Sequence, residues 1–196
     1  MSERARLAGT RVLLATPRVE DKGNSVVYQL LVPLREAGVD VGIVELDHSA
    51  SDPELTDEFR TEIDSFSSNP QEIVIGGFSL GARIAMEIAP SVRPLALLAF
   101  SFPAHKRGQP QATHGLQALR LVQCPTLIVQ GERDSHGSRT EMRGYAPLPE
   151  FVETFWLEDA NHQWLPKQSS PHTQEQHLQS AASAVLLFLG KLLSHQ

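Results

Sequence analysis

The fold is decided by one stretch of the sequence, Ile73-Val74-Ile75-Gly76-Gly77-Phe78-Ser79-Leu80-Gly81-Ala82-Arg83-Ile84-Ala85. It begins with a short apolar run of β-branched residues, which is typical of a buried strand. After the glycines it continues with alanines and other good helix formers, which indicates a helix. A G-x-S-x-G pattern, with the serine at position 79, stands between the two. The stretch therefore predicts a strand, a sharp turn and a helix in direct succession.

The glycines of this pattern indicate what the turn is for. A sharp strand-to-helix turn lifts the Ser79 hydroxyl above the edge of a sheet, where a base can activate it as a nucleophile. The residues two before and two after the serine are pressed together in such a turn, and Gly77 and Gly81 avoid the clash of a β-carbon. The alternative is a glycine-rich turn without chemistry. A Walker phosphate loop is excluded, because Ala82 and Arg83 stand where it needs Lys and Ser or Thr.

The composition is that of an ordinary globular chain. Its 196 residues are 41% hydrophobic and 20% charged, and we expect one domain over residues 1–196. The formal net charge of -6 argues against binding to nucleic acid or an anionic membrane, and no apolar run approaches the ~20 residues of a membrane span. Arg11 interrupts the weak apolar tract that follows Arg4 and Arg6, so we expect no signal peptide. The single cysteine, Cys124, excludes an internal disulfide, is expected to be buried, and favours a cytoplasmic location.

Strands and helices alternate along the chain. Apolar runs predict five strands besides the one before Ser79, at Arg11–Thr16, Val39–Leu46, Pro94–Phe102, Pro125–Gln130 and Phe151–Leu157. Helical spacing predicts four helices besides the one after Ser79, over Ser25–Ala37, from Ser51 to Phe66, near Leu116–Leu121 and over Gln174–Leu193. This alternation favours an α/β fold of three layers, a doubly wound and mostly parallel sheet of about six strands with helices on both faces.

Three residues that follow predicted strands have the chemistry of a catalytic triad. Ligands of doubly wound sheets bind beyond the carboxyl ends of the strands. Ser79 follows the third strand, Asp134 lies just past the strand that ends at Gln130, and His162 lies beyond the last strand. His162 would take the Ser79 proton and return it to the leaving group, while Asp134 would orient the imidazole. We therefore predict a Ser-His-Asp triad.

Other histidines compete with His162 for the role of base. His136 is only two residues from Asp134, so one short loop would have to supply both the acid and the base. Four more follow the fourth predicted strand or stand near the start of the last helix, namely His105, His114, His172 and His177. No H-E-x-x-H or Cys/His pattern is present, so we expect no metal site.

The sequence resembles the α/β-hydrolase superfamily over nearly its whole length. The resemblance is carried by Gly76-Gly77-Phe78-Ser79-Leu80-Gly81-Ala82-Arg83, by Pro125-Thr126-Leu127-Ile128-Val129-Gln130-Gly131-Glu132-Arg133-Asp134 and by Phe102-Pro103-Ala104-His105. The chain looks most like the small, lidless branch of predicted hydrolases that are similar to dienelactone hydrolases. That resemblance implies Ser79 as nucleophile, Asp134 as acid and His162 as base. It also implies hydrolysis of esters, thioesters or related acyl compounds without a cofactor.

One loop departs from the pattern of that superfamily. Its members commonly have a His-Gly-rich loop after the first strand, whose backbone helps to bind the oxyanion. Here the stretch reads Ala15-Thr16-Pro17-Arg18-Val19, and Pro17 has no N–H to donate. We expect the N–H of Leu80 as one oxyanion donor and that of Arg18 as the second, with Val19 as the alternative. Losing one donor costs about 3–4 kcal/mol of transition-state stabilisation, so turnover is expected to be modest.

The expected pocket is small and open. Phe78, Phe102, His105 and Trp164 flank the predicted site, although core packing explains the three aromatic rings about as well. No stretch between the fourth strand and the acid strand is long enough for a large cap domain. We therefore predict a serine esterase for small acyl substrates. The alternatives are a hydrolase-fold binding or scaffold protein and an acyltransferase that uses the same triad, and the sequence does not specify an oligomeric state.

Overall fold

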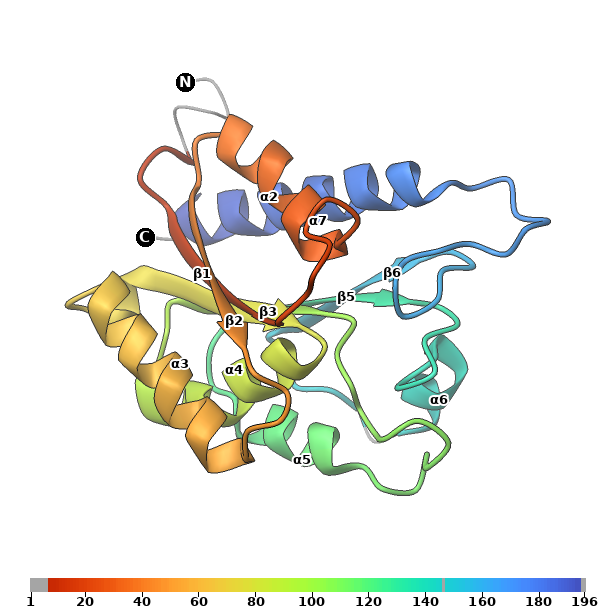
Figure 1. The fold of residues 1–196 in the computed structure, drawn as a ribbon, viewed down its shortest axis with the longest axis horizontal. Coiled ribbons are helices and arrows are strands. Elements are labelled where there is room, and N and C mark those ends of the chain that lie inside the picture. The colour runs from red at the N-terminus through yellow and green to blue at the C-terminus, as the bar shows by residue number, and fades with distance from the viewer. Residues whose placement is uncertain (1–6, 146, 195–196) are drawn as a thin grey trace.

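The computed structural model, which describes residues 7–145 and 147–194, places six parallel strands in one sheet between two layers of helices (Figure 1). The expectation of no signal peptide concerns residues that lie partly outside this range, since positions 1–6 are not described. The strands are β1 (Arg11–Pro17), β2 (Asp40–Leu46), β3 (Ile73–Phe78), β4 (Ala96–Phe100), β5 (Thr126–Gly131) and β6 (Val152–Leu157). Their order in the sheet is β2-β1-β3-β4-β5-β6, and every neighbouring pair is parallel.

The helices cover both faces of this sheet, as the alternating sequence pattern predicts. They are α2 (Val26–Glu36), α3 (Asp52–Phe66), α4 (Leu80–Val92), α5 (His114–Leu121), α6 (Arg139–Gly144) and α7 (Gln174–Ser194), with a short 3₁₀ turn at Pro70–Glu72. Helices α2 and α7 lie side by side on one face, while α3, α4 and α5 lie on the other (Figure 1). The prediction of a three-layer α/β fold is confirmed, and the sheet is wholly rather than mostly parallel.

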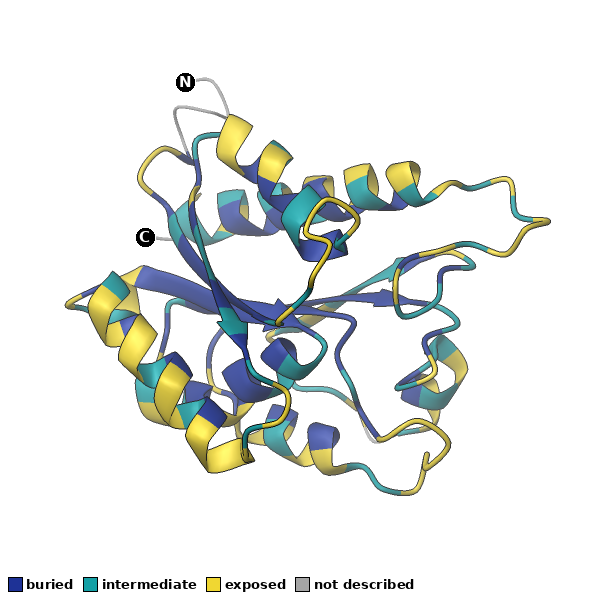
Figure 2. Cartoon of the chain, in the orientation of Figure 1, coloured by how far each residue is buried: buried dark blue, intermediate teal, exposed yellow. Residues whose placement is uncertain are grey.

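The core consists of two apolar layers, one on each side of the sheet (Figure 2). Strand β3 contributes to both, because successive side chains of a strand point to opposite faces. Val74 belongs to the layer under α2 and α7, whereas Ile73 and Ile75 belong to the layer under α3 and α4. All six residues of β3 are buried, so the strand that ends at Ser79 is held firmly in the middle of the molecule.

The strand order creates a crevice next to β3. The chain passes from β1 outward to β2 and then crosses back over β1 to form β3. The connections after β1 and β3 therefore leave the sheet in opposite directions, and ligands of doubly wound sheets bind at this point. Ser79 and the loop after β1 thus meet at the carboxyl edge of the sheet.

Two segments differ from the sequence prediction. Strand β4 is shorter than the predicted Pro94–Phe102 and ends at Phe100, because Ser101 has a positive φ of 48° that no extended strand accommodates. Helix α6 was not predicted, because it has only six residues and buries only Met142, which leaves no apolar period to detect.

Helix α7 is long and apolar enough to span a membrane by length and composition alone. In the structure it lies against α2 and the sheet, with a buried face that includes Ala181, Val185 and Phe188. A helix that covers a sheet passes the same test of length and composition. In this structure α7 is therefore one of the helices that cover the sheet.

Candidate active site

Ser79 stands in the strained turn that its glycine neighbours make possible. It joins β3 to α4 with φ 52° and ψ -112°, a conformation that is rare for a residue with a side chain. A β-carbon on Gly77 would lie 2.3 Å from the carbonyl oxygen of Ala15 and 2.5 Å from the carbonyl carbon of Gly81, and one on Gly81 would lie 2.0 Å from that same oxygen. The turn from Gly77 to Gly81, called the elbow from here on, therefore packs tightly against β1 and against itself, and this packing holds Ser79 in place.

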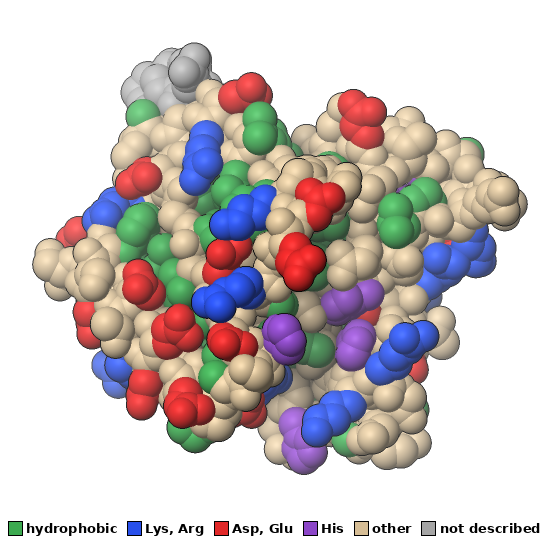
Figure 3. Space-filling view, viewed as in Figure 1, with side chains coloured by type: hydrophobic (Ala, Val, Ile, Leu, Met, Phe, Trp, Pro, Cys, Tyr) green, Lys and Arg blue, Asp and Glu red, His purple; other side chains and the backbone are tan. Residues whose placement is uncertain are grey.

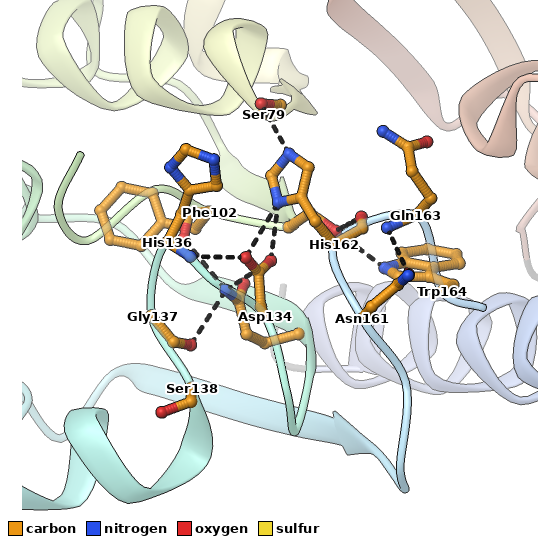
Figure 4. A network of polar contacts seen from close by, with 12 residues as sticks. Ser79, Phe102, Asp134, His136, Gly137, Ser138, Asn161, His162, Gln163 and Trp164 are labelled. Carbon is orange, nitrogen blue, oxygen red and sulfur yellow. Dashed lines mark hydrogen bonds and ion pairs between the residues drawn. The ribbon is translucent and has the colours of Figure 1, made fainter. Parts of the chain in front are cut away.

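The three residues predicted as a triad lie in contact (Figure 4). The Oγ of Ser79 is 2.9 Å from Nε2 of His162, and Nδ1 of His162 is 2.8 Å from Oδ2 and 3.0 Å from Oδ1 of Asp134. Because a carboxylate can only accept, Nδ1 carries the proton and Nε2 is left to accept the hydrogen bond of the serine hydroxyl. The arrangement can withdraw a proton from Ser79 and stabilise the imidazolium that results.

Asp134 is fully buried and is held by groups of its own loop. The backbone N–H of His136 donates to Oδ1 at 2.8 Å, and Nε2 of Gln130 donates to Oδ2 at 3.0 Å. The same Gln130 nitrogen lies 3.1 Å from the carbonyl oxygen of Phe102 and 3.2 Å from that of Gly137. Gln130, near the end of β5, thus joins the acid to Gly137 of the same loop and to the loop after β4, and it fixes the direction of the carboxylate.

A buried serine that the sequence gave no reason to single out positions the loop of His162. The hydroxyl of Ser101, at the end of β4, donates to the carbonyl oxygen of His162 at 2.8 Å and accepts the indole N–H of Trp164 at 2.9 Å. Asn161 closes the same turn, because its Oδ1 accepts the N–H groups of Gln163 and Leu165. His162 is therefore held at two points. Its backbone carbonyl is bonded to Ser101, which follows β4, and its ring is bonded to Asp134.

The loops that carry the acid and the base also touch each other directly. A β-carbon on Gly131 would lie 2.5 Å from the carbonyl oxygen of Asn161, so the two chains approach as closely as only glycine permits. The guanidinium of Arg133 then binds the carbonyl oxygen of Asp159 at 3.0 Å and its carboxylate at 3.2 Å. These contacts set the distance between Asp134 and His162.

The expected oxyanion donors have different fates. Leu80 is the first residue of α4, and an N–H at this position has no partner within the helix. The N–H of Leu80 donates to no described backbone group. The N–H of Arg18 donates to the carbonyl oxygen of Leu46 at 2.9 Å and continues the pairing of β1 with β2. The prediction of Arg18 as the second donor is therefore wrong, because its hydrogen is already used by the sheet. Val19 is half-buried, and its N–H donates to no described backbone group.

A pocket of about 350 Å³ adjoins Ser79. Its walls come from the end of β1, the loop and helix start that follow, the elbow and the loop of His162, and its lining residues are Thr16, Pro17, Val19, Asp21, Asn24, Ser25, Phe78, Ser79 and Gln163. Six of these nine side chains are polar. Phe78, as predicted, is a wall of this pocket, and its ring also lies 5.5 Å from that of His162, centre to centre.

The other three predicted pocket residues are buried parts of the structure. Phe102 and Trp164 are fully buried, and the Trp164 ring packs edge-on against Phe78 and Phe100. The side chain of His105 is 1% exposed, and its Nδ1 lies 2.8 Å from the carbonyl oxygen of Lys106. Their placement as pocket walls was wrong, because position after a strand does not tell whether a side chain turns outward or into the core.

His136, which the sequence presented only as a rival base, stands beside the triad. Its ring centre is 4.8 Å from that of His162, with the planes tilted by 48°. Burial, followed by the charge of His162, lowers the pKa of His136 below its ordinary value. At neutral pH it is therefore an uncharged ring next to the base, and it does not replace His162 because Ser79 is bonded to the latter.

His114, His172, His177 and the cysteine are not part of this arrangement. His114 is exposed at the start of α5, His177 is buried with Nδ1 2.8 Å from the carbonyl oxygen of Trp164, and His172 pairs with Glu158. Cys124 is buried, as predicted, and burial raises the pKa of its thiol to about 11, which leaves it unreactive. No group of three or more metal-binding side chains is found among the described residues.

The site opens directly on the surface of the molecule. Histidine side chains gather near the middle of the face in Figure 3, next to acidic and basic side chains. Between β4 and β5, where the sequence leaves no room for a cap, the structure has loops and the eight-residue helix α5. The fold is therefore that of a lidless domain.

The sequence of this chain matches the model of a known protein family. The family model described as the alpha/beta hydrolase domain matches residues 47–190, more than two thirds of the chain. No curated protein matches the sequence. XC6422 from Xanthomonas campestris, described as a serine hydrolase without a lid, has a TM-score of 0.66 at 17% identity, over 94% of this chain and 84% of its own.

Two other solved structures are similar in fold. Est1E from Butyrivibrio proteoclasticus has a TM-score of 0.71 at 12% identity, over 93% of this chain and 89% of its own. A serine hydrolase homologue from Coxiella burnetii has a TM-score of 0.65 at 18% identity, over 91% of this chain and 84% of its own. At such identities the likeness to each structure is one of fold. The match of the family model, over a lidless doubly wound sheet with a serine elbow, means that the chain belongs to the alpha/beta hydrolase domain family.

Proposed function

We propose that the protein is a serine hydrolase that cleaves small carboxylic esters or related acyl substrates through an acyl-enzyme. The observation that carries the proposal is the unbroken line of hydrogen bonds from Ser79 through His162 to Asp134, with 2.9 Å between Oγ and Nε2. A serine hydroxyl becomes a nucleophile when a positioned base can take its proton. Solved structures of similar fold that are described as an esterase domain from Rhodothermus marinus and as a monoacylglycerol lipase support this proposal.

The reaction follows from the positions of the two nitrogens of His162. Oγ of Ser79 attacks the carbonyl carbon while Nε2 takes the hydroxyl proton, and a tetrahedral oxyanion forms. The bond between carbon and the leaving oxygen then breaks, and Nε2 returns the proton to that oxygen. Water attacks the acyl-enzyme by the same route, gives its proton to Nε2, and the acid product leaves with the Ser79 hydroxyl restored.

The oxyanion would be bound at the start of α4. The N–H of Leu80 and the positive end of the helix dipole face the place where negative charge develops. Since Arg18 donates to β2, Val19 is the remaining backbone donor that we propose from the loop after β1. Val19 also lines the pocket beside Ser79. If Val19 fails to reach the oxyanion, the loss is about 3–4 kcal/mol and the enzyme is slow.

We assign the pocket beside Ser79 to the acyl group. A volume of about 350 Å³ suits a short acyl chain better than a fatty one. The open site without a cap agrees with small substrates that need no shielding from water. A small acyl compound is therefore the partner that we propose, and the single buried thiol of Cys124 agrees with a cytoplasmic setting.

One observation favours a second candidate, a binding or scaffold protein with little turnover. The loop that should help to bind the oxyanion contains Pro17, which has no N–H, and Arg18, whose N–H is used. The two candidates differ in the reactivity of Ser79, since an activated serine reacts with a fluorophosphonate and an idle one does not.

The Ser79→Ala variant tests the proposal. We expect turnover of p-nitrophenyl acetate to fall by at least about 10⁴-fold, because the nucleophile is gone while the fold remains. Intact mass after fluorophosphonate treatment should show one adduct on the wild type and none on the variant. Ser183→Ala is the matched control, because that hydroxyl binds only the Gln179 carbonyl on the exposed side of α7. Unchanged turnover in Ser79→Ala would remove Ser79 as the nucleophile, and a wild type without adduct would favour the scaffold.

A further inference from the structure

His136 offers the site a hydrogen-bond acceptor that the proton relay does not use. His136 is half-buried in the loop after β5, and its ring lies against that of His162, with 4.8 Å between the ring centres. Figure 4 shows the two rings side by side below Ser79. The His136 ring therefore lies directly beside the ring that is bonded to Ser79.

The contacts of the ring decide which nitrogen carries its proton. Nδ1 of His136 lies 3.2 Å from the carbonyl oxygen of His105, which can only accept, so the proton of the neutral ring is on Nδ1. Nε2 is then left with a lone pair, and it has no hydrogen-bond partner among the described residues. The lowered pKa, caused by burial and by the His162 charge, keeps this ring neutral at physiological pH.

The backbone keeps this acceptor in place. The N–H of His136 donates to Oδ1 of Asp134 at 2.8 Å, so the residue is fixed to the same carboxylate that orients His162. The carboxylate of Asp134 thus fixes both the backbone of His136 and the ring of His162. The main-chain bond is kept when the His136 side chain is replaced, which makes the role of the ring separable from the support of the triad.

The leaving group of an ester must lie on the side of His136. Its oxygen has to come within hydrogen-bond distance of His162 Nε2, because that nitrogen delivers the proton. The pocket lined by Val19 and Gln163 is assigned to the acyl group. The space beside the other flank of the His162 ring, where His136 stands, is then left for the alcohol part of the ester.

We propose that His136 determines leaving-group specificity: its Nε2 accepts a hydrogen bond from a second O–H or N–H of the leaving group, which favours esters of diols and polyols over esters of simple alcohols. This inference rests on the proposed hydrolase function and on the assignment of the acyl pocket. A ring that served only for packing could be apolar, so the nitrogen is what distinguishes the two roles.

The test compares 2-hydroxyethyl acetate with propyl acetate, which have the same acyl group and the same number of heavy atoms and differ in one terminal hydroxyl. We expect the wild type to have a kcat/KM about five- to tenfold higher for the hydroxyethyl ester, the effect of one neutral hydrogen bond. His136→Phe keeps an aromatic ring without an acceptor, and its ratio should fall to about one. His136→Gln keeps an acceptor and should retain a preference for the hydroxyethyl ester.

The controls separate this proposal from the one on which it rests. His114→Phe, at the exposed start of α5, should keep the wild-type ratio. A wild-type ratio of about one, or a ratio that is the same in His136→Phe as in the wild type, overturns the role of His136 while fluorophosphonate still labels Ser79. A wild type that neither takes the label nor turns over p-nitrophenyl acetate overturns the hydrolase function itself.

Discussion

Ser101 is a buried residue whose hydroxyl supports the loop of His162, the base that we propose. It has a positive φ of 48°, and its hydroxyl joins the indole of Trp164 to the backbone of His162. Both partners lie more than 60 positions further along the chain. The backbone of Ser101 is thus strained, and its side chain makes two hydrogen bonds that no other side chain at that point makes.

Replacing Ser101 by Ala should destabilise the protein and slow it. The buried indole N–H loses its acceptor, which costs about 1–3 kcal/mol in the free energy of unfolding, measured by urea denaturation. Because the loop of His162 loses one support, kcat should fall while KM changes little. Ser183→Ala on α7 should stay within about 0.5 kcal/mol of the wild type. A stable Ser101→Ala enzyme with full kcat would mean that the loop needs no such support.

At the scale of residues, the sequence predicted the triad but not its surroundings. Ser79, Asp134 and His162 follow three strands of a parallel sheet, and a rule of topology brings such positions together. No comparable rule tells the direction of a side chain in a loop, so Phe102, Trp164 and His105 were placed in the pocket although they lie in the core. The supporting serine had no signal at all.

The elbow is the element on which the site depends. The β-carbon of an alanine at position 81 would come 2.0 Å from the carbonyl oxygen of Ala15 in β1, so α4 would have to shift away from the sheet. We expect Gly81→Ala to lower the free energy of unfolding by more than about 3 kcal/mol, measured by thermal and urea denaturation. Gly144→Ala, at the end of α6, meets nothing within 4 Å and should be neutral or slightly stabilising. Equal stabilities of the two variants would contradict the close packing of the elbow on β1.

The elements themselves were mostly readable from the sequence, because the strands are continuous apolar runs and the long helices have one apolar face. Ser51, where the sequence predicts the start of the helix, forms a capping box with Glu54 at the start of α3. Helix α6 has the same signature in Ser138 and Glu141. It was missed because a cap marks a helix only when an apolar period follows it, and α6 is too short to have one.

At the scale of the whole molecule, ionised carboxylates tie segments together and make stability depend on pH. Burial alone would raise the pKa of Glu132, but its bonds to Arg139 and to the N–H of Asp159 hold this pKa below the ordinary value. The unfolded chain therefore takes up the proton first as the pH falls. The contribution of Glu132 is complete above its unfolded pKa of about 4.5 and is lost as the pH falls through the lower folded value.

The Glu132→Gln variant should show this dependence in its melting temperature. Near pH 7 it should melt below the wild type, since the ion pair with Arg139 is gone. Between pH 5 and about pH 3 the two curves should converge, because the wild-type carboxylate becomes neutral there as well. Melting curves in a series of buffers measure the difference, and a constant offset at every pH would show that the charge of Glu132 contributes nothing.

The hydrogen bond between Ser79 and His162 joins positions 83 residues apart. During synthesis the elbow leaves the ribosome long before the histidine is added, so the nascent chain carries a hydroxyl with no group to withdraw its proton. Under the function that we propose, Ser79 is an unactivated alcohol until the loop of His162 has settled on the sheet. The recovery of turnover during refolding would then report when the C-terminal part of the chain has folded onto the rest.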